Sequence, residues 1–383
     1  MPRYHLPMQI LADEAVWGVP EIFEHLGEVR TFTGRRLDRP ALSGVDALII
    51  RSVTPVNSSL LDGTAVRFVG TASTGSDHVD VNGLRNLGIT FATAAGCNAR
   101  TVAEYVLASL LHLAQSHSIA LEEKMIGIVG VGRIGSIVAD WCEVLGLRTL
   151  LCDPPRSRRG DRTDFIGLDA LLAQSDIVTF HVPLLRNGPD ATWRLMNERS
   201  ISACKSGAFL INTSRGDAVD ETALQTALAQ HKLAGVVLDV WAGEPNPSAA
   251  MVRAAELATP HVAGYSVEAR QRSAAIIRDE LSRFAGRTLT TASAGSAERG
   301  ESIDIAQGTN DRWGALRQAL FAACNLLEMD AALQRVVAGK NVSVEFDGLR
   351  QRFASRREFG YFHIAGVPAG ESIWKKLGFR QDP

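Results

Sequence analysis

Three polar residues in the second half of the chain have side chains that could together bind an anion and transfer a proton: Arg215, Glu244 and His261. Each lies after an apolar segment or in a loop that contains Gly or Pro, where α/β proteins place ligand contacts. A histidine has the intrinsic pKa needed to remove a hydroxyl proton near neutral pH. A carboxylate bonded to the imidazole orients it and favours its protonated form. An arginine fork binds a carboxylate and polarises a developing carbonyl.

Each of these residues also has an ordinary structural interpretation. Taken alone, Arg215 would be a surface charge and Glu244 a solvated carboxylate in a loop. His261 would be a structural histidine whose hydrogen bonds are made within the fold. The combination is more specific, because hydride transfer from a 2-hydroxy acid needs all three groups. We therefore expect His261 to act as acid/base, Glu244 to orient it and Arg215 to hold the substrate carboxylate. Asp239 is a candidate for holding the nicotinamide end of a cofactor.

A glycine-rich turn indicates which oxidant such a site would use. The turn is Gly130-Val-Gly132-Arg133-Ile134-Gly135, with an apolar strand before it and a helix after it. Its glycines allow a tight turn and a close approach of the backbone to a pyrophosphate at the helix N-terminus. Asp153 lies 18 positions after Gly135 at the end of the next strand and can accept hydrogen bonds from both ribose hydroxyls.

This context predicts NAD rather than NADP, since Asp153 would repel a 2′-phosphate. The nearby Arg156, Arg158 and Arg159 weaken that preference slightly. The alternative interpretation is a tight strand-to-helix turn that binds no ligand.

Length and composition limit the partners. At 383 residues the chain exceeds what one core supports, and the formal charge of −2 gives no sign of nucleic-acid or membrane-surface binding. The five cysteines are scattered without a CxxC pair, which argues against a disulfide framework or a metal site and favours a reducing cytoplasm. The start lacks the apolar core of a signal peptide, and the longest apolar stretch, 102–114, is too short to span a bilayer.

Strands alternating with helices predict parallel sheets, whose ligands gather beyond the strand C-termini. A Thr/Ser/Ala/Gly-rich linker is expected at 288–311, before a small Arg-rich C-terminal domain. The predicted strands are 8–11, 46–51, 66–70, 125–129, 148–152, 177–181, 208–212, 236–240, 341–346 and 361–364, and the predicted helices 17–26, 101–115, 134–145 and 314–329.

The chain resembles the D-2-hydroxyacid dehydrogenase family. The resemblance rests on the glycine turn with Asp153, the segment Asn212-Thr-Ser-Arg-Gly216, Asp239-Val-Trp with Glu244, and Thr259-Pro-His261. It implies an α/β fold of two Rossmann-like domains, flavodoxin-like catalytic and NAD-binding, with the active site in the cleft between them. Implied boundaries are 1–98 with 262–287 for the substrate domain, 99–261 for the NAD-binding domain and 312–383 for a C-terminal α+β dimerisation domain. In the family the matched Arg, Glu and His are catalytic.

Further segments are similar to a branch of that family that oxidises a phosphorylated sugar acid. They include Ile50-Arg-Ser-Val-Thr54, Gly75-Ser-Asp-His78, His261-Val-Ala-Gly-Tyr265 and the C-terminal domain. The implied reaction is NAD-dependent oxidation of 4-phospho-D-erythronate to (R)-3-hydroxy-2-oxo-4-phosphooxybutanoate, a step of pyridoxal 5′-phosphate (vitamin B6) biosynthesis, by a cytoplasmic homodimer.

The same resemblance assigns contacts. It places Arg51, Ser52, Ser73 and Tyr265 on the substrate and Gly264 near the cofactor. Arg51 and Ser52 end a strand, and their alternative interpretation is an ordinary strand boundary. Ser73 replaces an expected Thr but keeps the hydroxyl. Val182 stands where a Thr usually touches the cofactor, so no side-chain hydrogen bond is expected there.

Several alternatives stay open. The cluster Arg350, Arg352, Arg356 and Arg357 reads more readily as a solvated face that stabilises a dimer than as a group reaching a neighbouring subunit's phosphate. The chain could act on 3-phosphoglycerate or hydroxypyruvate instead. It could also be a non-enzymatic NAD-sensing interaction module, since such proteins share the fold.

Overall fold

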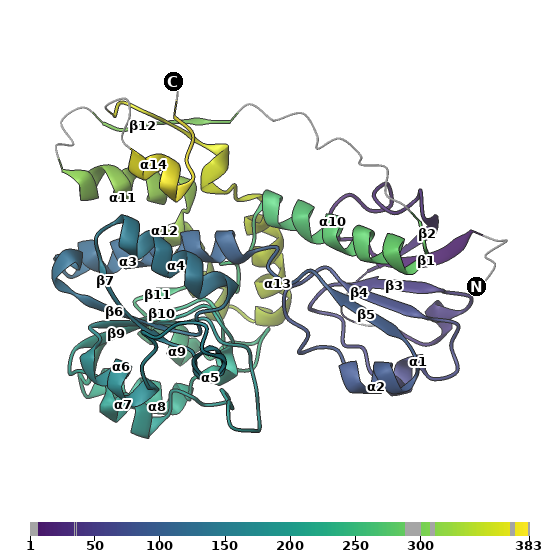
Figure 1. The fold of residues 1–383 in the computed structure, drawn as a ribbon, viewed down its shortest axis with the longest axis horizontal. Coiled ribbons are helices and arrows are strands. Elements are labelled where there is room, and N and C mark those ends of the chain that lie inside the picture. The colour runs from purple at the N-terminus through teal and green to yellow at the C-terminus, as the bar shows by residue number, and fades with distance from the viewer. Residues whose placement is uncertain are drawn as a thin grey trace. The chain divides into compact units, whose positions relative to one another are not determined.

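The computed structural model describes residues 7–33, 35, 37–287, 300–306, 311–367 and 372–381. Its strands form two large parallel sheets flanked by helices (Figure 1), which confirms the predicted α/β class. The chain divides into two compact units, the first within Met1–Asn98 and Glu268–Glu298 and the second within Ala99–Val267 and Arg299–Pro383. The domain boundaries implied by the resemblance remain predictions.

The sheet of the first unit has the strand order β2-β1-β3-β4-β5, which is the flavodoxin-like order. Its strands are β1 (Met8–Asp13), β2 (Gly27–Phe32), β3 (Ala47–Ile50), β4 (Phe68–Thr71) and β5 (Thr90–Thr93). Helix α10 (Val267–Phe284) covers one face, and α1 (Ser58–Leu61) and α2 (Val81–Asn86) cover the other (Figure 1). A short 3-10 helix, Pro40–Leu42, precedes β3.

Gly70 explains how closely α10 approaches this sheet. A Cβ at this position would lie 2.6 Å from the Cγ2 of Ile277 on α10. Ile277 is fully buried in one cluster with Ile10, Ile49 and Phe68. The glycine therefore lets the helix pack directly on β4.

The sheet of the second unit has the order β11-β10-β9-β8-β6-β7, all parallel. Its strands are β6 (Met125–Val129), β7 (Arg148–Cys152), β8 (Ile177–Phe180), β9 (Ala208–Asn212), β10 (Leu233–Leu238) and β11 (Leu257–Ala258). Because β7 and β8 flank β6 on opposite sides, the direction of winding reverses at β6. The carboxyl end of β6 is thus the position where such sheets bind ligands.

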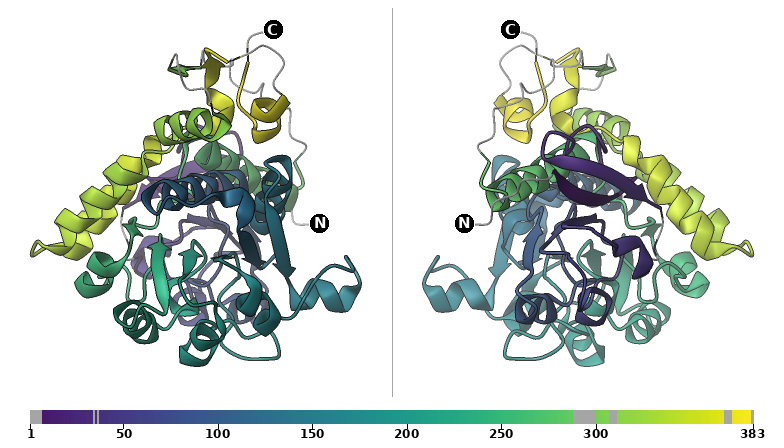
Figure 2. Two further views of the ribbon diagram at one scale, coloured as in Figure 1. Left: turned by 90° about the vertical axis from the view of Figure 1, so that its left-hand side faces the viewer. Right: turned by 90° about the vertical axis from the view of Figure 1, so that its right-hand side faces the viewer.

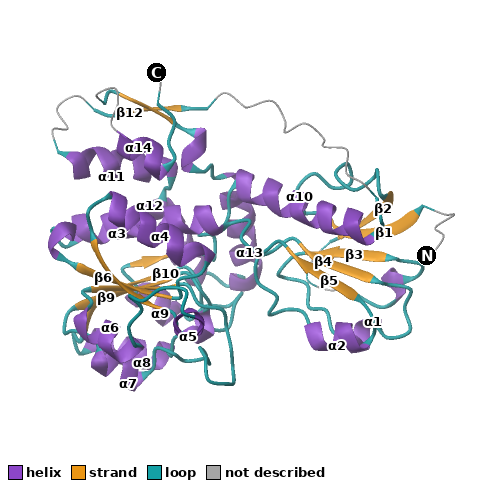
Figure 3. Ribbon diagram, viewed as in Figure 1, coloured by secondary structure: helices purple, strands orange, loops and turns teal. Residues whose placement is uncertain are grey.

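Helices cover both faces of this sheet (Figure 3). On one face lie α3 (Ala99–Ser116) and α4 (Arg133–Val144), whose apolar residues share a cluster with Ile128 and Ile211. The other face carries α6 (Leu168–Gln174), α7 (Glu198–Ala203), α8 (Glu221–Ala229) and α9 (Ala249–Ala254). The short helices α5 (Pro154–Arg159), Leu121–Glu123 and Gly216–Ala218 connect these elements.

The C-terminal residues add helices to the second unit. These are α11 (Arg312–Ala323), α12 (Leu326–Val337), α13 (Val342–Arg352) and α14 (Ser372–Leu377), with the parallel pair β12 (Ser302–Asp304) and β13 (His363–Ala365) and two 3-10 turns, Phe353–Ser355 and Phe359–Tyr361. Helix α11 packs on α3, and α12 packs on α9 and β11. Figure 2 shows the yellow-green C-terminal helices from two further sides. Their apolar side chains belong to the same clusters as the sheet's own helices.

Three local predictions need correction. The predicted strand 341–346 is wrong, because those residues begin α13; Val344 is 76% exposed while Phe346 is buried, as on a helix with one covered face. The predicted helix 17–26 is wrong, since successive turns replace it where Gly18 takes φ +67° and Pro20 lacks an N–H. Strands β2 and β5 were not predicted. Most of the predicted linker lies outside the described residues, and Ser302–Asp304 within it forms β12.

Within the described residues, no helix has the length and apolar character needed to cross a bilayer. The same residues contain no cluster of three His, Cys, Asp or Glu side chains that would hold a metal ion. All five cysteines are free and buried.

Candidate active site

His261 and Glu244, 17 positions apart in the chain, are joined by a hydrogen bond between Nδ1 and Oε2 of 2.7 Å. The other carboxylate oxygen of Glu244 accepts the backbone N–H of Trp241 at 2.9 Å, which fixes the carboxylate from its own loop. His261 has φ +57°, a left-handed backbone that non-glycine residues rarely adopt. The structure thus brings together the two residues that the sequence paired only by type.

Electrostatics keep Glu244 ionised. Burial by itself would raise the pKa of this carboxyl, but the positive charges of His261 and Arg350 outweigh it and lower the pKa below its usual value. An ionised carboxylate on Nδ1 fixes the ring and stabilises an imidazolium.

Asp239 holds the loop that carries His261. Its Oδ1 accepts the Thr259 hydroxyl at 2.6 Å and the Val262 N–H at 2.8 Å, and its Oδ2 accepts the Ala263 N–H at 2.9 Å. The Tyr105 hydroxyl extends this chain, 2.7 Å from the Thr259 hydroxyl. Burial raises the pKa of Asp239 to about 6. These bonds clamp the backbone on both sides of the left-handed residue, and Gly264 follows directly.

Arg215 lies just beyond β9, in a turn organised by Asn212. The Asn212 side chain accepts the Ser214 N–H at 3.0 Å and donates to the Arg215 carbonyl, also at 3.0 Å. A Cβ on the next residue, Gly216, would lie 2.0 Å from the Trp241 carbonyl carbon. Glycine is therefore required where the Arg215 turn touches the segment that leads to Glu244, a contact that the sequence analysis missed.

The glycine turn after β6 has the geometry expected of a phosphate-binding loop. Gly130 has φ +85°, and a Cβ there would lie 2.7 Å from the His181 carbonyl oxygen. A Cβ on Gly135 would lie 2.2 Å from the Gly130 carbonyl oxygen, whereas one on Gly132 would meet nothing within 4 Å. Helix α4 begins at Arg133 and Ile134 with no side-chain cap on Gly132. Its first N–H groups, which lack intrahelical acceptors, fit the pyrophosphate of a dinucleotide.

Asp153 contacts the same turn from the end of β7. Its Oδ2 accepts the Val131 N–H at 2.9 Å, and its Oδ1 caps α5 by accepting the Arg156 N–H at 3.0 Å. Carboxylate oxygens have further lone pairs, so Asp153 can still accept ribose hydroxyls. The Arg156 guanidinium also donates to the Val131 carbonyl, while Arg158 and Arg159 pair with acidic neighbours.

His181, which the sequence analysis did not select, lies at the end of β8 beside the turn. Its ring nitrogens lie 3.1 Å from the Thr179 hydroxyl and 3.3 Å from the Thr213 hydroxyl. Burial lowers its pKa to about 3, so the ring is neutral. The available signal was its place at the end of the strand next to β6. A Cβ on Gly130 would also lie 2.9 Å from the Val182 Cγ1, so an apolar side chain borders the turn there.

The first unit gathers the other predicted site residues at the carboxyl edge of its sheet. Arg51 follows β3, and its Nε donates to the fully buried Asp13 at the end of β1, 2.9 Å away. Ser52 is exposed beside it. These strands flank the point where that sheet changes winding direction, so the position again suits a ligand.

Ser73 follows β4, the neighbour of β3 at this edge, where Ile50 pairs with Thr71. Its hydroxyl lies 2.8 Å from the Thr71 hydroxyl and donates to the Gly75 carbonyl at 3.0 Å. The Thr71 hydroxyl also lies 3.0 Å from the His78 Nε2. Ser73 is thus part of an ordered polar loop next to Arg51 and Ser52.

The interpretation of the C-terminal arginines as one solvated face is wrong for two of them. Arg350 and Arg356 are only 6% and 8% exposed. Arg356 donates to the Thr101 carbonyl at 2.7 Å and lies 3.4 Å from Glu104 on α3. Because α13 and the turn after it pack inward, these two side chains face the interior of the second unit. Arg352 pairs with Glu328 and Arg357 lies over the Tyr361 ring, as surface arginines do.

Tyr265, four residues after His261, receives a hydrogen bond from Arg350. The Nη2 of Arg350 lies 2.8 Å from the phenol oxygen, and the guanidinium carbon lies 5.2 Å from the ring centroid. Its partner therefore comes from α13, 85 positions along the chain.

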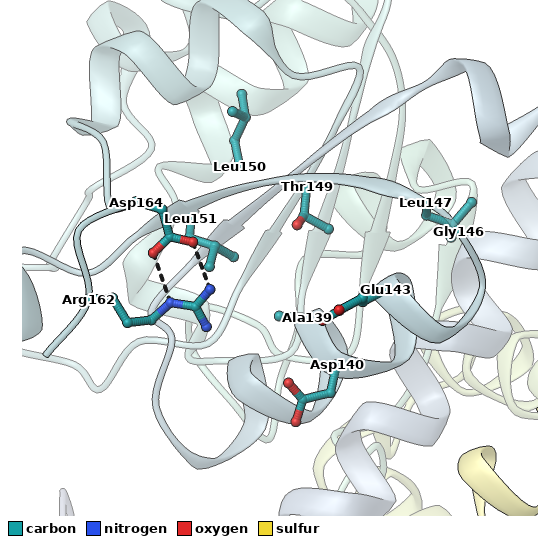
Figure 4. A pocket seen from close by; sticks show the side chains of 10 residues that line it. All are labelled: Ala139, Asp140, Glu143, Gly146, Leu147, Thr149, Leu150, Leu151, Arg162 and Asp164. Carbon is teal, nitrogen blue, oxygen red and sulfur yellow. Dashed lines mark hydrogen bonds and ion pairs between the residues drawn. The ribbon is translucent and has the colours of Figure 1, made fainter.

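A pocket of about 570 Å³ is lined by other residues (Figure 4). It is formed by the outer side of β7, the second half of α4 and the paired Arg162 and Asp164. None of the predicted site residues lines it.

Comparison with known sequences agrees with this geometry. Residues 98–263 match the family model described as the NAD-binding domain of D-isomer specific 2-hydroxyacid dehydrogenases, which confirms NAD as the predicted cofactor. The chain is 42% identical to an erythronate-4-phosphate dehydrogenase of Escherichia coli O139:H28 over 97% of its length and 98% of the relative's. It is 39% identical to the erythronate-4-phosphate dehydrogenase of Yersinia enterocolitica, over 97% of its own length and 99% of the relative's.

Solved structures share the fold over most of the chain. The TT0316 protein from Thermus thermophilus has a TM-score of 0.62 at 28% identity, covering 73% of this chain and 98% of its own. The NAD-dependent formate dehydrogenase from Staphylococcus aureus, solved in complex with NAD, has a TM-score of 0.59 at 27% identity, covering 72% and 95%.

Proposed function

Because the chain belongs to the D-isomer specific 2-hydroxyacid dehydrogenase family, we propose that it oxidises 4-phospho-D-erythronate to (R)-3-hydroxy-2-oxo-4-phosphooxybutanoate with NAD, a step of pyridoxal 5′-phosphate biosynthesis. The observation that carries the proposal is the 2.7 Å bond between His261 and Glu244 in a chain that aligns over 97% of its length with a relative named for this reaction. The identity of the proposed substrate rests on the names of such relatives, and the proposed proton transfer rests on the geometry of the site.

His261 is the acid/base. With Nδ1 bonded to Glu244, its Nε2 is the nitrogen that takes the proton of the C2 hydroxyl. The hydride that leaves C2 needs an acceptor, which the nicotinamide of NAD supplies when it is bound. Glu244, ionised and anchored to the Trp241 N–H, stabilises the resulting imidazolium. Arg215 binds the carboxylate next to C2 and stabilises the charge that develops on the carbonyl oxygen.

The dinucleotide is held by the turn after β6. Gly130, Gly132 and Gly135 shape the turn, and the N–H groups of Arg133 and Ile134 at the start of α4 would bind the pyrophosphate. Asp153 accepts the adenosine ribose hydroxyls and so selects NAD. The segment around Asp239 and Gly264 lies at the nicotinamide end, where Asp239 acts mainly by holding the 259–263 loop.

The substrate has two anionic ends, and the proposed contacts are polar groups suited to them. Arg51 and Ser52 after β3, and Ser73 after β4, offer a guanidinium and two hydroxyls at one sheet edge. Tyr265 offers a phenol four residues beyond His261. Guanidinium and hydroxyl donors bind both phosphate and carboxylate oxygens.

The proposal includes a cytoplasmic homodimer formed through residues 312–383. Val344 on α13 is 76% exposed and Leu327 on α12 is 59% exposed, so a partner that covered these two helices would bury both apolar side chains. Sedimentation of the wild type and of Val344→Glu tests this. A dimer that Val344→Glu weakens supports the proposal, and a wild-type monomer contradicts it.

The reaction is tested by following NADH formation with 4-phospho-D-erythronate and with 3-phosphoglycerate at equal concentrations. We expect kcat/KM to be higher for 4-phospho-D-erythronate. Faster use of 3-phosphoglycerate would contradict the substrate but keep the reaction class. Tight NADH binding without oxidation of either acid would identify an NAD-sensing protein instead.

A further inference from the structure

Arg350 is a buried cation whose ion pair is long. Its side chain is 8% exposed, and the Oδ1 of Asp347, one helical turn earlier, lies 3.9 Å from its Nη1. Its Nε has no hydrogen-bond partner among the described residues. Its closest polar contact is instead the phenol oxygen of Tyr265, at 2.8 Å. Burying a guanidinium on such terms costs free energy that an apolar side chain of similar size would not cost.

The contact decides how Tyr265 uses its hydroxyl. A phenol has one proton to donate and an oxygen that accepts. Arg350 has only donors, so the Tyr265 oxygen must accept from it, and the Tyr265 proton must point elsewhere. The guanidinium also lies 5.2 Å from the centre of the Tyr265 ring, where it restrains the ring as well as the hydroxyl. Tyr265 is therefore held as a hydrogen-bond donor.

We infer that Arg350 is a positioning residue for the substrate: from helix α13 it holds the Tyr265 hydroxyl so that its proton is donated to an oxyanion of the bound acid. This rests on the proposed function for the identity of that acid. The oxyanion belongs to the phosphate or the carboxylate, which present the same acceptor chemistry. The C-terminal helices thus contribute to the site of their own subunit.

The charge of Arg350 supports this place in the site. It acts on Glu244, the partner of His261, and contributes to lowering the pKa of that carboxyl. Arg352, two residues later on the same helix, contrasts with it. Its side chain is 54% exposed and pairs with Glu328 on α12. Position on α13, rather than the arginine type, therefore separates the two side chains.

The test compares Arg350→Met, Arg350→Lys and Tyr265→Phe with the matched control Arg352→Met. For 4-phospho-D-erythronate at saturating NAD we expect Arg350→Met to raise KM about tenfold, as for a lost hydrogen bond to a charged partner, with a smaller change in kcat. Arg350→Lys should recover most of this loss, since an ammonium also donates to the phenol. Arg352→Met should leave KM unchanged.

A double mutant separates positioning from stability. If Arg350 acts through Tyr265, Arg350→Met adds little to KM in a Tyr265→Phe background.

Comparing 4-phospho-D-erythronate with unphosphorylated D-erythronate identifies the oxyanion. A loss confined to the phosphorylated acid assigns the phosphate, and an equal loss with both assigns the carboxylate.

Three results would overturn the inference: independent, multiplying effects of the two substitutions, an unchanged KM in Arg350→Met, or an equal effect of Arg352→Met. If Arg350→Met does not fold, Arg350→Gln, whose shorter side chain does not reach the Tyr265 phenol, is compared in the wild-type and Tyr265→Phe backgrounds instead. Binding of the acid to the NADH complex, followed by NADH fluorescence, needs no turnover. A wild type that binds 4-phospho-D-erythronate without oxidising it contradicts the proposed reaction, while the binding of the variants still decides the role of Arg350.

Discussion

At the scale of single residues, the proposed chemistry depends on one strained backbone position. His261 has φ +57°, and the buried Asp239 holds the N–H groups of the two residues that follow it. Strain of this kind persists only where the surroundings fix it. The site thus places its imidazole by a buried carboxylate that need not touch substrate.

We predict that His261→Asn lowers kcat by about 10²- to 10⁴-fold, the usual contribution of general acid/base catalysis. Asn tolerates a left-handed backbone, so the loop should survive. NADH binding, measured by fluorescence, should stay near the wild-type value. His231→Asn is the matched control, because His231 is exposed and also left-handed, with φ +54°. Retained turnover in His261→Asn would remove His261 from proton transfer.

A second residue-scale prediction concerns His181, whose pKa burial lowers from 6.5 to about 3. In the unfolded chain His181 therefore becomes protonated below pH 6.5, whereas in the folded chain it stays neutral down to about pH 3. The contribution of neutral His181 to the free energy of unfolding is fully present above pH 6.5. It is lost as pH falls through that window, by up to about 1.4 kcal/mol per pH unit for one proton.

We expect His181→Asn to remove this contribution, so that its free energy of unfolding falls less steeply than the wild type's between pH 6.5 and about pH 4, within the window set by that shift. Urea unfolding at several pH values measures the difference. His231→Asn should keep the wild-type slope, because His231 is exposed. Parallel curves for His181→Asn and wild type would show that His181 is not held neutral.

At the scale of elements, the turn between β6 and α4 combines two demands on glycine. Gly130 and Gly135 are needed by the fold itself, since a Cβ on either would lie within 2.7 Å of a backbone oxygen. Gly132 has open space, so we explain its glycine by the proposed pyrophosphate rather than by packing within the protein.

This contrast predicts opposite phenotypes for two identical substitutions. Gly130→Ala should lower the free energy of unfolding by more than about 1 kcal/mol, because of its φ of +85° and the contact with His181. Gly132→Ala should unfold like the wild type but bind NADH more weakly. Thermal unfolding and NADH titration of both variants measure this. Equal NADH affinity in Gly132→Ala and wild type would argue against a pyrophosphate at that position.

We expect Asp153, at the end of β7, to select NAD over NADP. Asp153→Asn should lower the preference for NAD over NADP in kcat/KM by about tenfold, since the repulsion of a 2′-phosphate and a charge-assisted hydrogen bond are lost. Asn can still cap α5, so the element should be kept. Asp161→Asn, next to Arg156 and Arg159, is the control charge removal. An unchanged preference would show that the ribose is held elsewhere.

At the scale of the molecule, the C-terminal helices are part of the second unit's interior. Leu333 on α12 is fully buried in one cluster with Met251 of α9, and the buried Arg356 reaches Glu104 on α3. Folding of the nucleotide-binding sheet and of these helices should therefore be one cooperative event.

We predict that Leu333→Ala lowers the free energy of unfolding by about 2–5 kcal/mol, as a cavity in a shared core does. The loss should appear in the transition that releases NADH. Arg335→Ala on the same helix, where the side chain is exposed, should have little effect. A separate early transition that leaves NADH binding intact would mean that residues 312–383 unfold as an independent domain.

The sequence by itself determined the α/β class. It also predicted the dinucleotide turn with Asp153 and the residue types of the proposed catalytic set, because these depend on glycine spacing and on which residues follow strands. It missed the edge strand β2, whose faces alternate without a fully buried side, and misread the start of α13 as a strand.

Only the tertiary structure decided which partners those residues have. The bond from Arg350 to Tyr265 spans 85 positions and the contact of Arg356 with Glu104 spans 252, and no local pattern distinguishes Arg350 and Arg356 from the exposed Arg352. Whether a charged side chain is solvated or buried against a functional group depends on how distant helices pack. That packing is set by the complementarity of whole surfaces, whereas the sequence pattern records only type and spacing along one chain.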